Sequence, residues 1–205
     1  MQTMRLVESA LMIALATVLS LVPELLPLKL WPNGGSITPL SMLPIALVAF
    51  RYSVPWGIGT GCVYGLIQMI LGAENLSYGT SWYAVVAIIL FDYIIAFGVL
   101  GLAGIFRNKF HSKNPRIQSM EQPLEITAGV VVSGLLRYAC HFISGVTVWR
   151  TWDHGVAPEI WSLFYNGTYM VPEIVLTAIG AFILASCLDF SSTKIRPRNA
   201  FKKHA

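Results

Sequence analysis

The sequence predicts an all-α integral membrane protein, a six-transmembrane-helix bundle with both its N-terminus and its C-terminus in the cytoplasm. The first observation is composition: 55% of the 205 residues are hydrophobic and only 12% are charged, whereas soluble domains usually carry about 25% charged residues. The mean hydropathy is correspondingly high, +0.64. The second is that the apolar residues gather into six stretches of about the length that crosses a bilayer, ~20 residues. The third is the placement of the basic residues.

The six apolar stretches leave little chain for a soluble domain. The first is too long for the apolar core of a secretory signal peptide and no cleavage site closes it, so we interpret it as the first helix. Pro39 and Pro44 fall in the second stretch and are expected to bend that helix. We predict one membrane domain over residues 1–190 and a basic cytoplasmic tail over 191–205. The predicted helices cover about 6–27, 37–52, 55–73, 82–106, 123–149 and 161–188.

The basic residues set the predicted orientation. One side of the bundle holds only Lys29 and Arg150, and all the others except Arg137, which lies inside a predicted helix, fall on alternate loops and the termini. By the positive-inside rule, that second side is cytoplasmic, which requires an even number of spans. The basic tail is predicted to contact anionic lipid, and nucleic acid is not a predicted partner. The residues on the predicted cytoplasmic side are Arg5, Arg51, Arg107, Lys109, Lys113, Arg116, Lys194, Arg196, Arg198, Lys202 and Lys203.

The three cysteines lie singly inside apolar stretches, at Cys62, Cys140 and Cys187. An odd and scattered set gives neither a disulfide framework nor a CxxC metal pattern. We therefore interpret them as small core residues, and we predict no metal site.

Tryptophan is distributed unevenly between the two predicted membrane faces. Only Trp56 lies near the inner face; the five at the outer face are Trp31, Trp82, Trp149, Trp152 and Trp161. Trp and Tyr normally line both interfaces, so this asymmetry exceeds an interfacial belt, although a belt explains any single one of them equally well. Clustered aromatic rings can stack on a flat, cationic or heteroaromatic ligand.

Three polar side chains fall at similar depth in three predicted helices. Asp92 lies ten residues inward from Trp82, His141 eight inward from Trp149, and Asn166 five inward from Trp161. At ~1.5 Å per residue, each is within ~15 Å of the outer end of its helix. Taken alone, Asn166 is typical of a hydrogen bond between helices and His141 of a satisfied core residue, but an intramembrane carboxylate indicates function. Together they predict an outward-facing binding pocket.

Two further features belong to the predicted fifth and sixth helices. Gly145 falls midway between His141 and Trp149 on one helical stripe, where it either leaves room for a ligand or packs against another helix.

Arg137 and Glu173 each lie twelve residues inward from a tryptophan, at a depth near ~18 Å. An unpaired charge there costs at least ~2.5–3.5 kcal/mol. We expect Arg137 to pair with Glu173 and to position His141 one turn above, with Asp92 as the competing partner.

Several segments of the chain carry a family resemblance. After Gly34-Gly-Ser36 come MLPIALVAFRY, GLIQMILG, FDYIIAF, LLRYACHFISG and YNGTYMVP. In this order and spacing they closely resemble the thiamine-specific substrate-binding (S) component of energy-coupling-factor (ECF) vitamin transporters, over nearly the whole chain. The resemblance implies a six-helix bundle in the cell membrane that captures external thiamine with high affinity. It also implies delivery through a transmembrane scaffold subunit and two cytoplasmic ATPase subunits.

The resemblance also implies the binding residues. Asp92 takes the acidic position of the fourth helix, where some members have Glu, and a scaffold-docking face is implied at Ala10 and Ala14, a small-xxx-small pair that could instead pack inside the bundle. Thiamine carries a permanently cationic thiazolium and a flat aminopyrimidine, which suits stacking, a counter-charge and hydrogen bonds. The implied ligand-binding residues are Trp31, Trp82, Asp92, Tyr93, His141, Gly145, Trp149, Trp161 and Asn166.

Other classes of function remain as alternatives. An ion-coupled secondary transporter would use Asp92 as its coupling site, and an S component of this kind could serve a different vitamin. A membrane enzyme would use Asp92 and His141 as acid and base, but no metal-ligand spacing or nucleophile elbow accompanies them. We therefore expect no enzyme. The chain has no Walker motif, so in an ATP-driven system the energy would come from partners.

Overall fold

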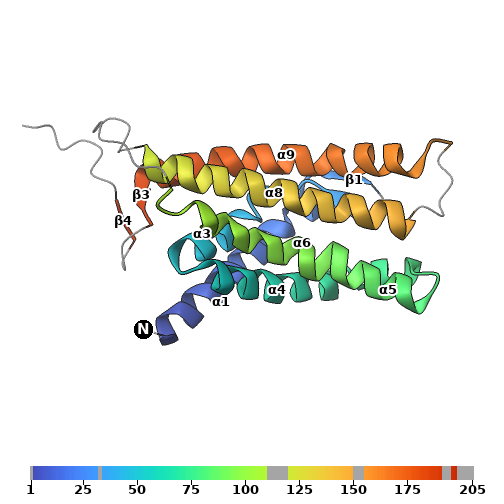
Figure 1. The fold of residues 1–205 in the computed structure, drawn as a ribbon, viewed down its shortest axis with the longest axis horizontal. Coiled ribbons are helices and arrows are strands. Elements are labelled where there is room, and N and C mark those ends of the chain that lie inside the picture. The colour runs from blue at the N-terminus through green and yellow to red at the C-terminus, as the bar shows by residue number, and fades with distance from the viewer. Residues whose placement is uncertain (1, 32–33, 110–119, 150–154, 191–194, 198–205) are drawn as a thin grey trace, which may run out of the picture.

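The computed structural model describes residues 2–31, 34–109, 120–149, 155–190 and 195–197, and these form a bundle of helices (Figure 1). Within them, five spans are long and apolar enough to cross a membrane. This confirms the mainly helical membrane class, and each of these spans overlaps a predicted helix. They are Gln2–Leu25, Val54–Leu71, Trp82–Phe106, Glu121–Thr147 and Pro158–Cys187.

The first span continues into a β-hairpin that the sequence did not predict. Helices α1 (Gln2–Ser20) and α2 (Val22–Leu25) are followed by strands β1 (Lys29–Trp31) and β2 (Gly34–Ser36), which pair antiparallel. Gly35 has a φ of +73°, a left-handed conformation that glycine adopts at no steric cost. A Cβ there would collide with the rings of Trp31 and Tyr169. The tight turn therefore brings the hairpin against α9 (Pro158–Cys187).

The second predicted helix, over 37–52, was wrong in extent. The helix found there, α3, is only Leu43–Arg51, about 13.5 Å long and less than half of the ~30 Å core of a bilayer. Pro39 lies before it and Pro44 occupies its first turn, so neither proline bends it; proline disfavours helix in the residue before it and suits a first turn. Every residue from Leu43 to Phe50 is buried.

The next two spans pack so closely that glycine is required between them. Helix α4 is Val54–Leu71, and after the 3₁₀ segment η1 (Ala73–Tyr78) the fourth predicted helix follows as one composite span. A Cβ added at Gly57, Gly61 or Gly65 would collide with atoms of the facing segments. The composite span consists of α5 (Trp82–Ile88), the π-helix η2 (Ile89–Ile94), α6 (Ile95–Gly98) and the 3₁₀-helix η3 (Val99–Phe106).

The last two spans, α8 (Glu121–Thr147) and α9, lie side by side along their length (Figure 1). A short hairpin follows α9, in which β3 (Leu188–Asp189) pairs with β4 (Arg196–Pro197). The start of α1 and the end of α9 lie at the same end of the bundle (Figure 1). The rest of the predicted tail, like Trp152, Lys113, Arg116 and Arg150, lies outside the described residues.

The two ends of the bundle differ in their side chains. At the arginine end, defined by Arg51 and Arg107, Arg51 pairs with Glu8 of α1 and Arg107 Nη1 donates to the Arg51 carbonyl at 2.8 Å. Trp56 lies towards this end, where its Nε1 donates to Ser9 Oγ at 2.9 Å. The opposite end, here called the tryptophan end, carries the start of α5, the end of α8 and the start of α9.

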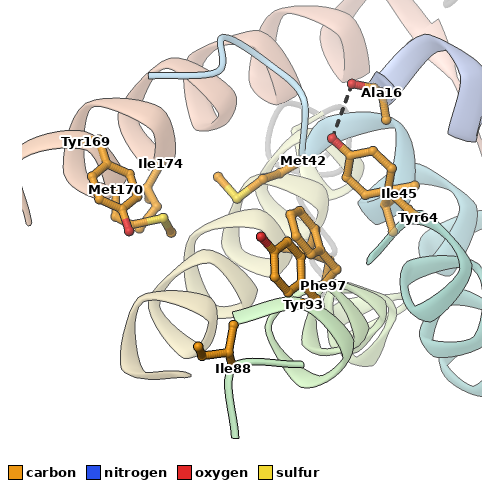
Figure 2. Close-up of a cluster of buried hydrophobic side chains, with 11 residues drawn as sticks. Ala16, Met42, Ile45, Tyr64, Ile88, Tyr93, Phe97, Tyr169, Met170 and Ile174 are labelled. Atoms are coloured by element: carbon orange, nitrogen blue, oxygen red, sulfur yellow. Dashed lines mark hydrogen bonds between the residues drawn. The ribbon is translucent and has the colours of Figure 1, made fainter. Parts of the chain in front are cut away.

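The main hydrophobic core fills the middle of the bundle (Figure 2). Tyr64 is fully buried, and its hydroxyl donates to the Ala16 carbonyl at 3.2 Å, which ties α4 to α1. The three cysteines are free; Cys140 is buried as expected, but Cys187 is exposed. The core residues shown are Ala16, Met42, Ile45, Tyr64, Ile88, Tyr93, Phe97, Tyr169, Met170 and Ile174.

The close approach of α4 to α3 gives a test of the packing. We expect Gly57→Ala to lower the melting temperature in detergent, because the new methyl overlaps Ala49 and overpacking of this kind costs about 1–3 kcal/mol. The matched control is Gly59→Ala on the same helix, where a Cβ meets nothing within 4 Å. That control should be neutral or stabilising. Equal melting temperatures for the two variants would contradict the proposed packing.

Candidate functional site

The carboxylate of Asp92 is the centre of the candidate site. Asp92 lies in the π-helix η2, and π-helical turns inside α-helices frequently mark functional sites. Three side chains of α8 and its C-terminal end surround it. Ser144 Oγ donates to Oδ2 at 2.6 Å, Trp149 Nε1 donates to Oδ2 at 3.5 Å, and His141 Nδ1 lies 3.1 Å from Oδ1. Both carboxylate oxygens are thus held from one helix.

His141 has one engaged and one unengaged nitrogen. An ionised carboxylate can only accept, so Nδ1 carries the hydrogen that Asp92 accepts. In the neutral imidazole, Nε2 is then a hydrogen-bond acceptor. It is buried and has no hydrogen-bond partner among the described residues. Because buried polar atoms in proteins are almost always partnered, Nε2 is suited to receive a donor from a ligand.

Aromatic rings form the wall beside this carboxylate. Trp31 of β1 lies against α9: its Nε1 donates to Thr168 Oγ1 at 2.9 Å, and its ring centroid lies 5.8 Å from that of Trp161. A series of ring contacts leads from Trp31 through two tyrosines of α9 to His141, and a separate contact joins Trp149 to Tyr78. The centroid distances are 5.2 Å for Trp31 and Tyr165, 5.9 Å for Tyr165 and Tyr169, 6.3 Å for Tyr169 and His141, and 5.5 Å for Trp149 and Tyr78.

Asn166 and Gly145 form the junction between α8 and α9. Asn166 is buried, and its Nδ2 donates to the carbonyl and the hydroxyl of Ser162 at 2.9 and 3.1 Å. Its Oδ1 accepts from Tyr169 at 2.5 Å. A Cβ at Gly145 would overlap Ser162 Oγ. Of the two interpretations of Gly145, helix packing is therefore the one that this geometry supports.

Two predicted site residues are not brought to this group. Trp82 is 78% exposed, and its ring contacts Tyr83 at 5.9 Å between centroids. Tyr93 is buried and points away from the Asp92 group, and its hydroxyl donates to the Gly72 carbonyl and accepts from Asn75, both at 3.1 Å. Neighbouring residues point in different directions on a helix, so proximity in sequence to Asp92 did not place Tyr93 at the site.

Arg137 and Glu173 lie in contact below the site, with Nη1 2.9 Å from Oε1. Both are buried, and Ser41 Oγ also donates to Glu173 Oε1 at 3.1 Å. The Arg137 guanidinium lies 4.3 Å from the centroid of Phe97, which adds a cation–π contact. Asp92, which was expected as the competing partner of Arg137, instead contacts His141 and Ser144.

Sequence reasoning missed several residues of the group. Ser144 falls three residues after His141, and Tyr165 and Tyr169 fall four and eight residues after Trp161. These spacings place them on the same helical faces as predicted site residues, so periodicity could have found them. The contact of Thr168 with Trp31 had no such indication, because it depends on the hairpin.

The comparisons with known proteins decide the family. The family model described as Thiamine transporter protein (Thia_YuaJ) matches residues 6–191. The chain belongs to this family. It is 34% identical to the thiamine transporter ThiT of Bacillus subtilis (strain 168) over 179 residues, which is 87% of this chain and 88% of that protein. It is 26% identical to ThiT of Lacticaseibacillus paracasei over 186 residues, 89% of this chain and 87% of that one.

The fold agrees with the family assignment. A solved structure of ThiT from Listeria monocytogenes superposes with a TM-score of 0.69 at 22% identity, covering 90% of this chain and 94% of that one. The resemblance to thiamine-specific S components is thereby confirmed. The chain is a multi-pass protein of the cell membrane and a member of a thiamine-transporter family.

The buried pair below the site gives a stability test. Glu173→Gln leaves Arg137 without its counter-charge, and removing one partner of a buried pair typically costs about 3–5 kcal/mol. We expect a lower melting temperature and folded yield, whereas Glu159→Gln, at an exposed position of the same helix, should change neither. The double replacement of Arg137 and Glu173 by Met should restore much of the stability. Unchanged yield and affinity in Glu173→Gln, with destabilisation in Asp92→Asn, would contradict the pairing.

Proposed function

We propose that this protein captures extracellular thiamine as the S component of an ATP-driven ECF transporter. One observation carries the proposal: a half-buried carboxylate, Asp92, is held in fixed orientation beside a wall of aromatic rings. Such a group offers a counter-charge and stacking faces together, which is what a flat organic cation requires. The family is one of thiamine transporters, and the relatives from Bacillus subtilis and Lacticaseibacillus paracasei are thiamine transporters by name, which supports this ligand.

The chemistry of thiamine matches the residues on both sides of Asp92. Its thiazolium cation can lie near the Asp92 carboxylate and over a tryptophan face, where a desolvated cation–π contact contributes ~2 kcal/mol. The exocyclic amine of its aminopyrimidine is a donor suited to the unpartnered Nε2 of His141. Trp31, Trp149 and Trp161 offer the stacking surfaces, and Asn166 Oδ1, with one partner, can accept a second hydrogen bond.

Delivery would depend on partners, because the chain carries no nucleotide-binding motif. We propose that a transmembrane scaffold subunit docks on α1 and that two cytoplasmic ATPase subunits drive release. Ala10 and Ala14 are both exposed, whereas Ser9 and Ala16 form the buried side of the helix. This exposure supports docking over internal packing. Small side chains allow another helix to approach closely. The tail residues would contact anionic lipid at the cytoplasmic face.

Two experiments distinguish the proposed function from the alternative functions. An ion-coupled transporter would take up thiamine in cells that lack the ATPase subunits, and an S component for a different vitamin would prefer riboflavin or biotin in a binding titration.

The residues around Asp92 favour an organic cation over a metal ion. The donors that hold Asp92 are a hydroxyl, an imidazole and an indole, and among the described residues no cluster of three metal-binding side chains occurs.

We expect the purified protein to bind thiamine in preference to riboflavin and biotin, with quenching of tryptophan fluorescence. Trp149→Ala should weaken binding at least about tenfold, in line with the loss of a desolvated stacking contact. Trp56→Ala is the control, since Trp56 bonds to Ser9 away from the site, and its affinity should be unchanged. Equal losses in both variants would count against the site, and absence of thiamine binding would overturn the function.

The docking face is tested by enlarging it. Replacing Ala10 and Ala14 together with tryptophan should abolish thiamine uptake in cells that contain the full transporter, because the bulky rings keep the scaffold from approaching. Thiamine binding by the purified variant should remain intact, since neither alanine contacts the site. Loss of binding together with uptake would show instead that these residues support the bundle itself.

A further inference from the structure

We propose that Ser144 is a positioning residue that keeps the Asp92 carboxylate ionised and oriented, and that the site thereby selects ligands by positive charge. This inference rests on the proposed function, because the ligand it concerns is thiamine. Ser144 falls within the segment LLRYACHFISG but was not among the predicted site residues. Its role emerges only from the contact between α8 and the π-helix η2.

The hydrogen bond of Ser144 differs from those of Ser133 and Thr147, two other aliphatic hydroxyl residues of α8. Ser133 donates to the Val130 carbonyl and Thr147 to the Ile143 carbonyl, each within one turn of its own helix, as helical Ser and Thr commonly do. Ser144 Oγ instead donates across to Asp92 Oδ2 at 2.6 Å. That is the length of a charge-assisted hydrogen bond. The residue is fully buried, so water does not compete for the hydroxyl.

Ser144 is the strongest of the donors to its carboxylate oxygen. Trp149 Nε1 reaches the same Oδ2 only at 3.5 Å, the outer limit of a hydrogen bond. His141 holds the other oxygen, Oδ1. With at least one close partner on each oxygen, the carboxylate plane is fixed relative to α8. Removing the Ser144 hydroxyl would leave Oδ2 with one weak donor, and would favour the protonated form of the carboxyl group.

The charge balance in the middle of the bundle indicates what Asp92 is held for. Away from the helix ends, the charged side chains of the described spans are Asp92, Arg137 and Glu173. Arg137 and Glu173 neutralise each other in direct contact. The donors to Asp92 are a hydroxyl, an indole and an imidazole. While the imidazole is neutral, one negative charge remains on Asp92. A monocation would balance this charge, and a ligand carrying added phosphate charge would not.

The other titratable groups near Asp92 define the pH range for a test. They are Cys140 and His141 on α8, Tyr93 on η2, Tyr165 and Tyr169 on α9, and Tyr78 beside Trp149. Free tyrosine and cysteine are neutral below about pH 8, whereas free histidine changes charge between pH 5 and 8. All of these groups are common to the wild type and a Ser144 variant, so a difference between the two pH profiles reports on the Asp92 contact that the variant lacks.

The experiment compares Ser144→Ala with Ser133→Ala, two fully buried serines on the same helix. Thiamine binding is titrated from pH 5 to 8. Binding of 4-amino-5-hydroxymethyl-2-methylpyrimidine, the uncharged half of thiamine, is measured by competition. We expect Ser144→Ala to bind thiamine at least about tenfold more weakly, as on losing one hydrogen bond to a charged group, with a steeper loss towards acid pH. The neutral fragment should lose less than about twofold, and Ser133→Ala should match the wild type.

Each other outcome contradicts the inference in a distinguishable way. Equal losses for thiamine and for the neutral fragment, or a pH profile parallel to that of the wild type, would make Ser144 a structural residue only. Unchanged thiamine affinity would remove its role altogether. If Ser144→Ala fails to fold, Ser144→Cys, which keeps a weak donor of similar size, is measured instead and should give an intermediate loss with the same dependence on ligand charge. A wild-type protein that does not bind thiamine would overturn the proposed function itself.

Discussion

Asp92, Arg137 and Glu173 carry charge in the middle of the described bundle, and each must be satisfied where little water reaches it. Helix α8 meets this constraint for both centres of charge. Arg137 on α8 pairs with Glu173 of α9, while one turn above it His141, and then Ser144 and Trp149, hold Asp92 of η2. The same helix therefore closes one ion pair and holds the other carboxylate through a hydroxyl and an imidazole. That difference separates the structural centre from the candidate binding centre.

The aromatic wall depends on how the chain covers α9. The short hairpin turns at Gly35, in a conformation with positive φ, and so lays Trp31 on Trp161, Tyr165 and Thr168. The half-length helix α3 begins only after Thr38 and Ser41. The hydroxyls of these two residues lie 2.8 Å apart, and Ser41 also donates to the Glu173 carboxylate. One polar connection thus links the hairpin segment to the buried ion pair, so the cover of the site and its floor are parts of one network.

Much of the candidate site could be predicted from sequence because depth in a membrane helix follows directly from residue number. Counting inward from tryptophans placed Asp92 and His141 at one level and Arg137 and Glu173 at another, and each pair is in contact. Counting does not give the direction in which a side chain points. The family resemblance implied Trp82 and Tyr93 as binding residues, but Trp82 faces outwards and Tyr93 faces η1.

The sequence by itself determined the membrane class, the five long spans and the family, because hydrophobic length and charge asymmetry are properties of local composition. It also determined which polar residues had to be satisfied inside the bundle. Tertiary structure alone decided that the stretch at 37–52 contains only a half-length helix. Its apolar residues are buried by the neighbouring helices, and its composition alone does not distinguish such a buried short helix from a helix that crosses the membrane. Tertiary structure likewise decided that Ser144 bonds to Asp92 rather than to its own helix. That choice depends on the packing of η2 against α8, a long-range contact that no local pattern encodes.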